Sequence, residues 1–202
     1  MTPRLSKSPW STDWRVMFHP AAAYQQLAEA PAAPGAWLAV RRPLLFAFVL
    51  GCAVSMTASG RLTLRLVVPT TAYGLLMALV EVLSLAVVRE KTAMPFSRSL
   101  DLFFTGFGPW LLWLLPFATI WAFASPFDAY RWTGPEWDGY VAAAIAIWSA
   151  YIDFCFFRYV FRVPTRRAAA NLVVQRAFSW TLAALIFGGG SLWSELVRKL
   201  GI

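Results

Sequence analysis

The chain has 202 residues, of which 59% are hydrophobic, 16% aromatic and only 14% charged. A soluble domain of this length carries far more charge, so the composition predicts a membrane protein. The formal net charge of +8 does not indicate nucleic-acid binding, because no basic stretch is interleaved with aromatic residues outside the apolar runs. Lysine and arginine are instead expected in the cytoplasmic loops of a multi-pass protein. We therefore expect the lipid bilayer, and no nucleic acid, as a partner.

Residues 1–42 are polar to amphipathic and form a predicted cytoplasmic N-terminal segment without the apolar run of a cleaved signal peptide. A short helix is predicted over Pro20–Ala30, since proline is tolerated in the first helical turn. Glu29–Gly35 is a predicted stiff linker. The segment carries an apolar stripe formed by Trp14, Val16, Met17, Phe18, Tyr24 and Leu27. This stripe predicts an interfacial amphipathic helix on the membrane surface.

Two apolar runs follow Arg41 and Arg42. The first predicted span covers residues 43–59 and the second covers residues 66–88, and each is long enough to cross the hydrocarbon core as a helix. A tight turn is predicted between them at Ser59–Gly60.

The third predicted span covers residues 102–124 and follows a polar lead-in that begins at Met94. As one helix it would be about 34 Å long, which is enough to cross a bilayer core. It contains Gly106, Gly108, Pro109 and Pro116, and each proline removes one intrahelical hydrogen bond. The prolines fall on nearly one helical face, so we interpret them as kinks that curve a packing helix. A gate in a transporter is the alternative.

The last two predicted spans cover residues 140–161 and 172–193. We expect the fifth helix to extend back toward Pro164 and to weaken at Gly188–Gly190. The tail, 194–202, belongs to a predicted short C-terminal helix that starts near Ser191. The predicted fold class is therefore all-α: a polytopic membrane protein with five transmembrane helices in a membrane domain spanning residues 43–193.

Five spans place the two termini on opposite sides of the membrane, and the charged residues decide the orientation. With the N-terminus in the cytoplasm, thirteen lysines and arginines lie inside and five lie outside. The loop 125–138 would then be an outer loop. The predicted location is the inner (plasma) membrane, multi-pass, with the N-terminus cytoplasmic and the C-terminus on the opposite side.

Two acidic residues lie within predicted spans, Glu81 in the second and Asp153 in the fourth. An ionisable group at this depth is a functional-site hypothesis, and its partner must be named. The antiparallel arrangement of spans four and five predicts Arg176 as the partner of Asp153, with Arg158 as second choice. Glu81 is expected to bond Thr105, Arg158 or water. A structural ion pair is favoured over transport, and a proton or cation site requires Glu81 and Asp153 to converge.

Motifs of nucleophilic, metal-dependent or nucleotide-dependent enzymes do not occur in the sequence. His19 is the only histidine, and Cys52 and Cys155 are isolated in apolar runs. We therefore predict no enzymatic activity, no cofactor and no metal site.

Three stretches together resemble a known family. They are Met17–Leu27 with FHPAAAYQQL, Met94–Pro109 with PFSRSLDLFFTGFGP, and Trp148–Ala170 with WSAYIDFCFFRYVFRVPTRRAAA. In this order and at this spacing they resemble the YIP-domain family of five-span membrane proteins, in its bacterial branch. The resemblance implies a non-catalytic membrane protein, and no residues for Rab binding can be transferred to this chain.

The leading functional hypothesis is an accessory or scaffold subunit of a membrane assembly, with protein partners or a homo-oligomer. The alternative is a small transporter or channel that uses Glu81 and Asp153. A weaker alternative is a membrane-shaping protein that inserts its N-terminal amphipathic segment.

Overall fold

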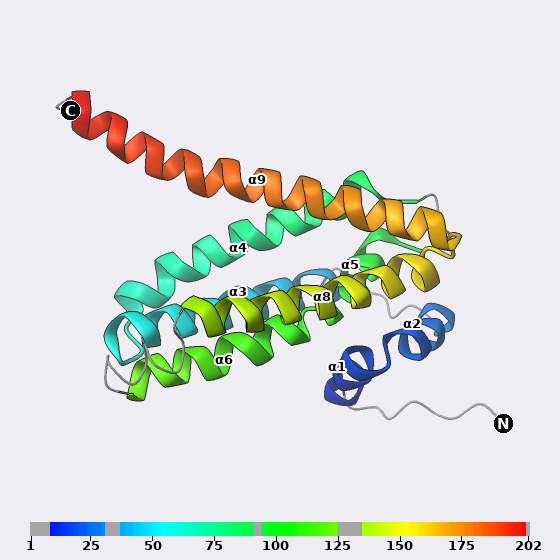
Figure 1. The fold of residues 1–202 in the computed structure, drawn as a ribbon. Coiled ribbons are helices and arrows are strands. Elements are labelled where there is room, and N and C mark those ends of the chain that lie inside the picture. The colour runs from blue at the N-terminus through cyan, green and yellow to red at the C-terminus, as the bar shows by residue number, and fades with distance from the viewer. Residues whose placement is uncertain (1–8, 31–36, 91–93, 125–134, 201–202) are drawn as a thin grey trace.

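The computed structural model describes residues 9–30, 37–90, 94–124 and 135–200, and every element in these ranges is a helix (Figure 1). The helices are α1 (Pro9–Phe18), α2 (Pro20–Glu29), α3 (Trp37–Ser59), α4 (Leu64–Val87), α5 (Phe96–Thr105), α6 (Gly108–Phe123), α8 (Pro135–Val160) and α9 (Thr165–Leu200). The predicted all-α class is confirmed. Residues 31–35 of the predicted linker 29–35 and residues 125–134 of the predicted outer loop 125–138 lie outside the described residues. Glu29 is the last residue of α2, and the end of the predicted loop from Pro135 belongs to α8.

Four helices are long and apolar enough to cross a membrane, namely α3, α4, α8 and the first part of α9. The pair α5 and α6 passes the same test as a fifth span, bent by 45° at its break. The structure is thus compatible with a multi-pass membrane protein. The helix of the first predicted span, α3, begins at Trp37 instead of Pro43, so Pro43 lies inside the helix.

The third span differs from the prediction, since it is two helices and not one curved helix. The break lies at Gly106 and Phe107, and Pro109 stands in the first turn of α6, where no intrahelical donor is needed. Pro116 lies inside α6 without interrupting it. The break is also a close contact: a Cβ on Gly108 would lie 1.9 Å from Met17 Sδ, and one on Gly106 would lie 2.9 Å from Ile152 Cγ2.

The predicted separate C-terminal helix is wrong. Helix α9 runs continuously from Thr165 to Leu200, through Gly188–Gly190. Each glycine costs a helix about 1 kcal/mol relative to alanine, and three of them without a proline do not stop a helix that has strong helix formers on both sides.

The N-terminal apolar stripe is covered by the protein itself and not left for the membrane surface. Val16 and Tyr24 are fully buried, and Met17 and Leu27 are nearly so, whereas Trp14 and Phe18 remain exposed. The Tyr24 hydroxyl donates to the Leu102 carbonyl at 3.3 Å. Trp148 Nε1 donates to the Met17 carbonyl at 2.9 Å, so α8 holds the end of α1.

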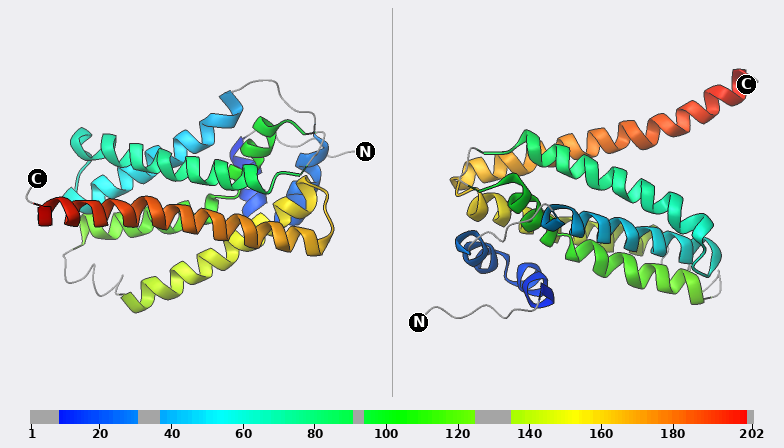
Figure 2. Two further views of the ribbon diagram at one scale, coloured as in Figure 1. Left: turned by 90° about the horizontal axis from the view of Figure 1, so that it is seen from above. Right: turned by 180° about the vertical axis from the view of Figure 1, so that it is seen from behind.

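The helices run back and forth along one bundle. Figures 1 and 2 show α1 and α2 at the end where α5 begins and α8 turns into α9, with the end of α9 at the opposite end. Near the first end, aromatic rings form the centre of the core: Phe156 meets Phe103 at 5.4 Å and Phe157 at 5.4 Å between ring centroids, edge to face. Because α1 and the end of α9 lie at opposite ends of the bundle, the arrangement fits an odd number of spans.

Small residues let α3 and α4 approach closely. A Cβ on Gly74 would lie 2.9 Å from the Ala47 Cα, and one on Gly51 would lie 2.9 Å from the Thr71 amide nitrogen. The turn between these helices contains Gly60 at a φ of +66°, a conformation that glycine adopts without strain, as the predicted Ser59–Gly60 turn requires.

We predict that Gly74→Ala lowers the free energy of unfolding by about 1–3 kcal/mol, because the added methyl meets backbone and not a movable side chain. Gly139→Ala is the matched control, since its Cβ has open space and the change favours the helix. Denaturant titration of both purified variants in mild detergent measures the difference. Equal stability of the two variants would contradict the close contact.

Candidate intramembrane polar site

The first part of the site is an ion pair between α8 and α9. Arg176 bonds the carboxylate of Asp153 and also donates to Ser149 Oγ at 2.8 Å. Trp110 Nε1 of α6 donates to the same Ser149 Oγ at 3.1 Å. The Asp153 side chain is 2% exposed and that of Arg176 is 22% exposed. The predicted pairing of Asp153 with Arg176 is therefore present, with a hydroxyl that links it to α6.

The second part surrounds Glu81 of α4. Its carboxylate accepts from Gln175 Nε2 and from Ser179 Oγ, each at 2.7 Å. Gln175 and Ser179 are four residues apart on α9 and so face the same side of that helix. Ser84 Oγ donates to the Glu81 carbonyl at 2.8 Å and accepts from Gln175 Nε2 at 3.1 Å. Both carboxylate oxygens are thus satisfied by α9, which explains how Glu81 can lie buried.

The two side chains predicted to bond Glu81, Thr105 and Arg158, have other partners. Thr105 instead donates to the Asp101 carbonyl at 2.8 Å, a bond within its own helix. Arg158 donates to the Val163 carbonyl at 2.5 Å and so ties the end of α8 to the turn before α9. Arg158 is therefore outside the polar site, and the contact it makes belongs to the hairpin.

The two carboxylates meet through α9, where Gln175 and Arg176 are consecutive. Glu81, Asp153 and Arg176 together carry a formal net charge of one negative. Gln175 is fully buried, and its Oε1 atom has no hydrogen-bond partner among the described residues. The buried site therefore has an excess of acceptors.

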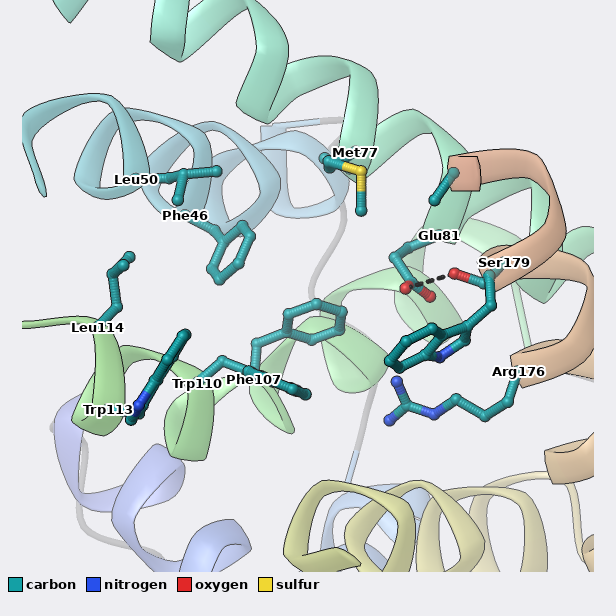
Figure 3. Close-up of a pocket in the computed structure, with 13 residues that line it drawn as sticks. Phe46, Leu50, Met77, Glu81, Phe107, Trp110, Trp113, Leu114, Arg176 and Ser179 are labelled. Atoms are coloured by element: carbon teal, nitrogen blue, oxygen red, sulfur yellow. Dashed lines mark hydrogen bonds between the residues drawn. The ribbon is translucent and has the colours of Figure 1, made fainter. Parts of the chain in front are cut away.

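A cavity of about 340 Å³ adjoins this site, between α3, α4, α6 and α9 (Figure 3). Glu81, Ser179 and Arg176 lie together at one side of it, and Phe46, Leu50, Trp113 and Leu114 lie at the other. The cavity is thus apolar apart from one polar side. Such a space can hold an apolar or amphipathic group, with a carboxylate and a guanidinium available at one end.

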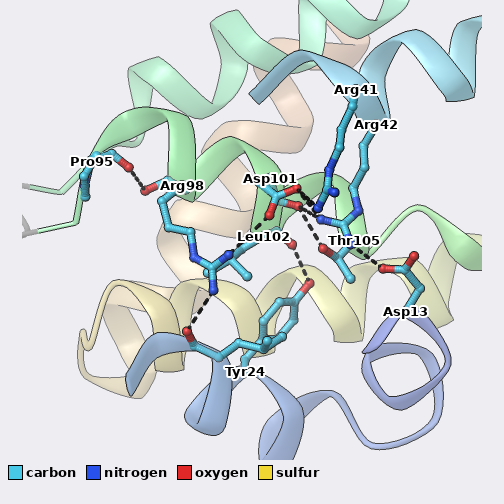
Figure 4. A network of polar contacts seen from close by, with 11 residues as sticks. Asp13, Tyr24, Arg41, Arg42, Pro95, Arg98, Asp101, Leu102 and Thr105 are labelled. Atoms are coloured by element: carbon cyan, nitrogen blue, oxygen red, sulfur yellow. Dashed lines mark hydrogen bonds and ion pairs between the residues drawn. The ribbon is translucent and has the colours of Figure 1, made fainter. Parts of the chain in front are cut away.

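A second polar cluster was missed by the sequence analysis. Asp101 of α5, whose side chain is 3% exposed, accepts from Arg41 at 3.2 Å, from Arg98 at 3.3 Å, and from Arg42 (Figure 4). Arg42 also bonds Asp13 of α1 at 2.7 Å. Burial raises the pKa of Asp13, and Arg42 opposes that shift. We call these five residues the Asp101 cluster.

The sequence contained only a weak signal for this cluster. Arg41 and Arg42 have the position of membrane-face arginines, and Asp101 lies in the polar lead-in of the third span. The spacing of Arg98 and Asp101 by three residues on a helix was the local clue. The contacts with Arg41 and Arg42 depend on the break after Thr105, which turns α5 toward the start of α3.

Metal-binding side chains do not gather in the part of the chain that is described: no group of three His, Cys, Asp or Glu lies close together there. Cys155 is packed in the aromatic core and Cys52 is partly buried in α3. His19 stands at the N-cap position of α2, where its side chain makes no capping hydrogen bond.

We predict that Arg176→Met lowers the free energy of unfolding by about 3–5 kcal/mol, because it leaves the Asp153 charge buried without a counter-charge. Adding Asp153→Asn should recover most of that loss, since the remaining buried group is neutral. The two variants are compared by denaturant titration in detergent, with the exposed Arg65→Gln as a control for loss of one positive charge. If Arg176→Met alone leaves stability unchanged, the ion pair contributes nothing to the fold.

Comparison with known proteins does not assign the chain to a family. No protein-family model matches it, and neither a curated protein nor a solved structure matches it. The resemblance to the YIP-domain family therefore stays a prediction.

Proposed function

We propose that the protein is a non-catalytic, multi-pass membrane protein of the YIP type that acts as an accessory or scaffold subunit of a larger membrane assembly. The observation that carries the proposal is the position of α9. Its C-terminal part extends away from the bundle (Figures 1 and 2). Its apolar segment within Thr165–Ile186, which could span the membrane, is only 17% buried inside the protein, against 33% for the corresponding segment of α8. A helix held on one side only is available to a partner.

The lining of the cavity beside α9 favours a transmembrane helix as the partner of this protein. Its wall contains Trp110, Trp113 and Trp180, and Trp180 is 64% exposed. Association of helices within a bilayer depends on van der Waals packing and on polar contacts between helices. A concave aromatic surface with a polar side offers both to a transmembrane helix of another subunit or of a second copy.

The proposed location is the inner membrane with the N-terminus in the cytoplasm. The charge distribution along the sequence supports it. The helix ends that carry Arg42, Arg98 and Arg158 also lie at one end of the bundle, together with α1 and α2.

The assembly proposal is tested by photo-crosslinking in native membranes, with a photoreactive phenylalanine at Trp180 or Leu185 on α9. Both side chains are strongly exposed. A partner helix predicts one discrete protein adduct from both positions, identified by mass spectrometry. Ile147 on α8, at 72% exposure, is the matched control and should give no such adduct. Lipid adducts alone at all three positions would remove the proposal.

A transporter or channel is the second candidate, because Glu81 and Arg176 reach the same cavity. The excess of acceptors around Gln175 favours a cation or a proton in this role. The third hypothesis, membrane shaping by the N-terminal segment, has less support, since α8 and α5 already cover most of the apolar stripe.

For the transport candidate, proton flux is measured in liposomes that contain the purified protein and an internal pH dye. Glu81→Gln should reduce the flux to the level of empty liposomes. Glu90→Gln is the control: it removes a carboxylate of the same size, but one that pairs with Arg167 outside the buried site. The Arg167 guanidinium already holds the pKa of Glu90 below its usual range. Equal flux in both variants excludes Glu81 from transport.

A further inference from the structure

A second cavity lies beside the Asp101 cluster, between α1, α3 and α6, with a volume of about 250 Å³. Only one end of it is charged, where Asp13 and Arg42 face it. The rest is apolar and includes Leu45, Phe104, Leu111, Leu112 and Leu115. The cavity is therefore a groove with a polar entrance and an apolar interior.

The Asp101 cluster, to which Asp13 and Arg42 belong, has more positive than negative charge. Three arginines meet two aspartates in the Asp101 cluster, which leaves one positive charge in excess. Arg41 Nε and Arg98 Nε are buried and have no hydrogen-bond partner. The Arg41 side chain is 35% exposed, against 14% for Arg42 and 15% for Arg98. The excess positive charge beside a partly exposed arginine side chain favours an anionic partner at this end of the cavity.

The apolar interior follows α6 into the membrane domain. From Gly108 to Leu115 the lining extends for about 10 Å along the helix axis. Leu112 is 39% exposed and Leu115 is 50% exposed, so the groove is accessible from its side. A bilayer would cover this side, because α3 and α6 belong to its apolar spans.

We propose that this groove binds one anionic phospholipid, with the headgroup phosphate at Arg41 and Arg42 and one acyl chain along α6. A phosphate provides a counter-charge for the excess positive charge of the Asp101 cluster, and one acyl chain lies along the apolar groove. The end of the bundle that carries α1 and α2 then faces the leaflet that supplies the lipid. This inference does not depend on a role in assembly or transport.

The proposal is tested by native mass spectrometry of the protein after reconstitution with equal amounts of phosphatidylglycerol and phosphatidylcholine. One phosphatidylglycerol should be retained in preference to phosphatidylcholine. Arg41→Gln should reduce that preference about fivefold, the factor expected when one arginine near an anionic lipid surface is lost. Arg65→Gln, which removes an equal charge from the first turn of α4, should leave the preference unchanged. Equal retention of both lipids by the wild-type protein overturns the proposal.

The groove is tested separately by filling it. Leu112→Trp and Leu115→Trp should each lower retention of either lipid, because the indole occupies the space of the acyl chain. Two positions are used so that a folding defect in one does not decide the result, and thermal unfolding identifies such a defect. Leu79→Trp, at an equally exposed site on α4, is the control. Unchanged retention in both groove variants shows that the lipid is not bound there.

Discussion

The bonds of Asp101 with three arginines are the interaction on which one end of the molecule depends. Asp101 is on α5, Arg41 and Arg42 are on α3, and Arg42 continues to Asp13 on α1. Three elements that are distant in sequence are thus joined through Asp101 and Arg42. Removing the Asp101 carboxylate would leave three guanidinium groups in a partly buried place with Asp13 as their only counter-charge in the cluster, and such groups repel one another strongly. The break between α5 and α6 allows these contacts, because it turns α5 toward the start of α3. In an unbroken third span, Asp101 would not have this orientation.

Near the middle of the bundle, α9 joins its neighbouring helices as Asp101 joins elements at the end. It supplies Gln175 and Ser179 to Glu81, and Arg176 to Asp153, so two neighbouring helices are attached to it by polar bonds. Polar bonds between helices matter in a bilayer because apolar side chains give little preference for protein over lipid. The same helix is sparsely packed in its apolar part, so its position is determined by these few polar residues. This combination gives α9 a fixed orientation near its start and a free surface farther along.

The sequence predicted the helices well where apolar runs are long and bounded by charge, as for α4 and α8. It also predicted the partner of Asp153, because a short turn between antiparallel helices fixes which residues are level with each other. It failed where the outcome depended on contacts between distant segments. The partners of Glu81 come from α9, ninety-four or more residues away, and no local pattern identifies them. Likewise, the apolar stripe of α1 and α2 looks the same whether lipid or α8 covers it.

The hairpin of α3 and α4 is closed entirely by local contacts. Ser55 Oγ donates to the Arg61 carbonyl and accepts from the Thr63 amide, each at 3.0 Å, so the turn caps itself. Beyond the turn, Gly51 and Gly74 admit their neighbours on the opposite helix without help from any other element. Contacts of short sequence separation form quickly and need little loop closure. During synthesis, which proceeds from the N-terminus, this pair can be complete before α6 or α9 exists, and it then provides a preformed surface on which the later spans assemble.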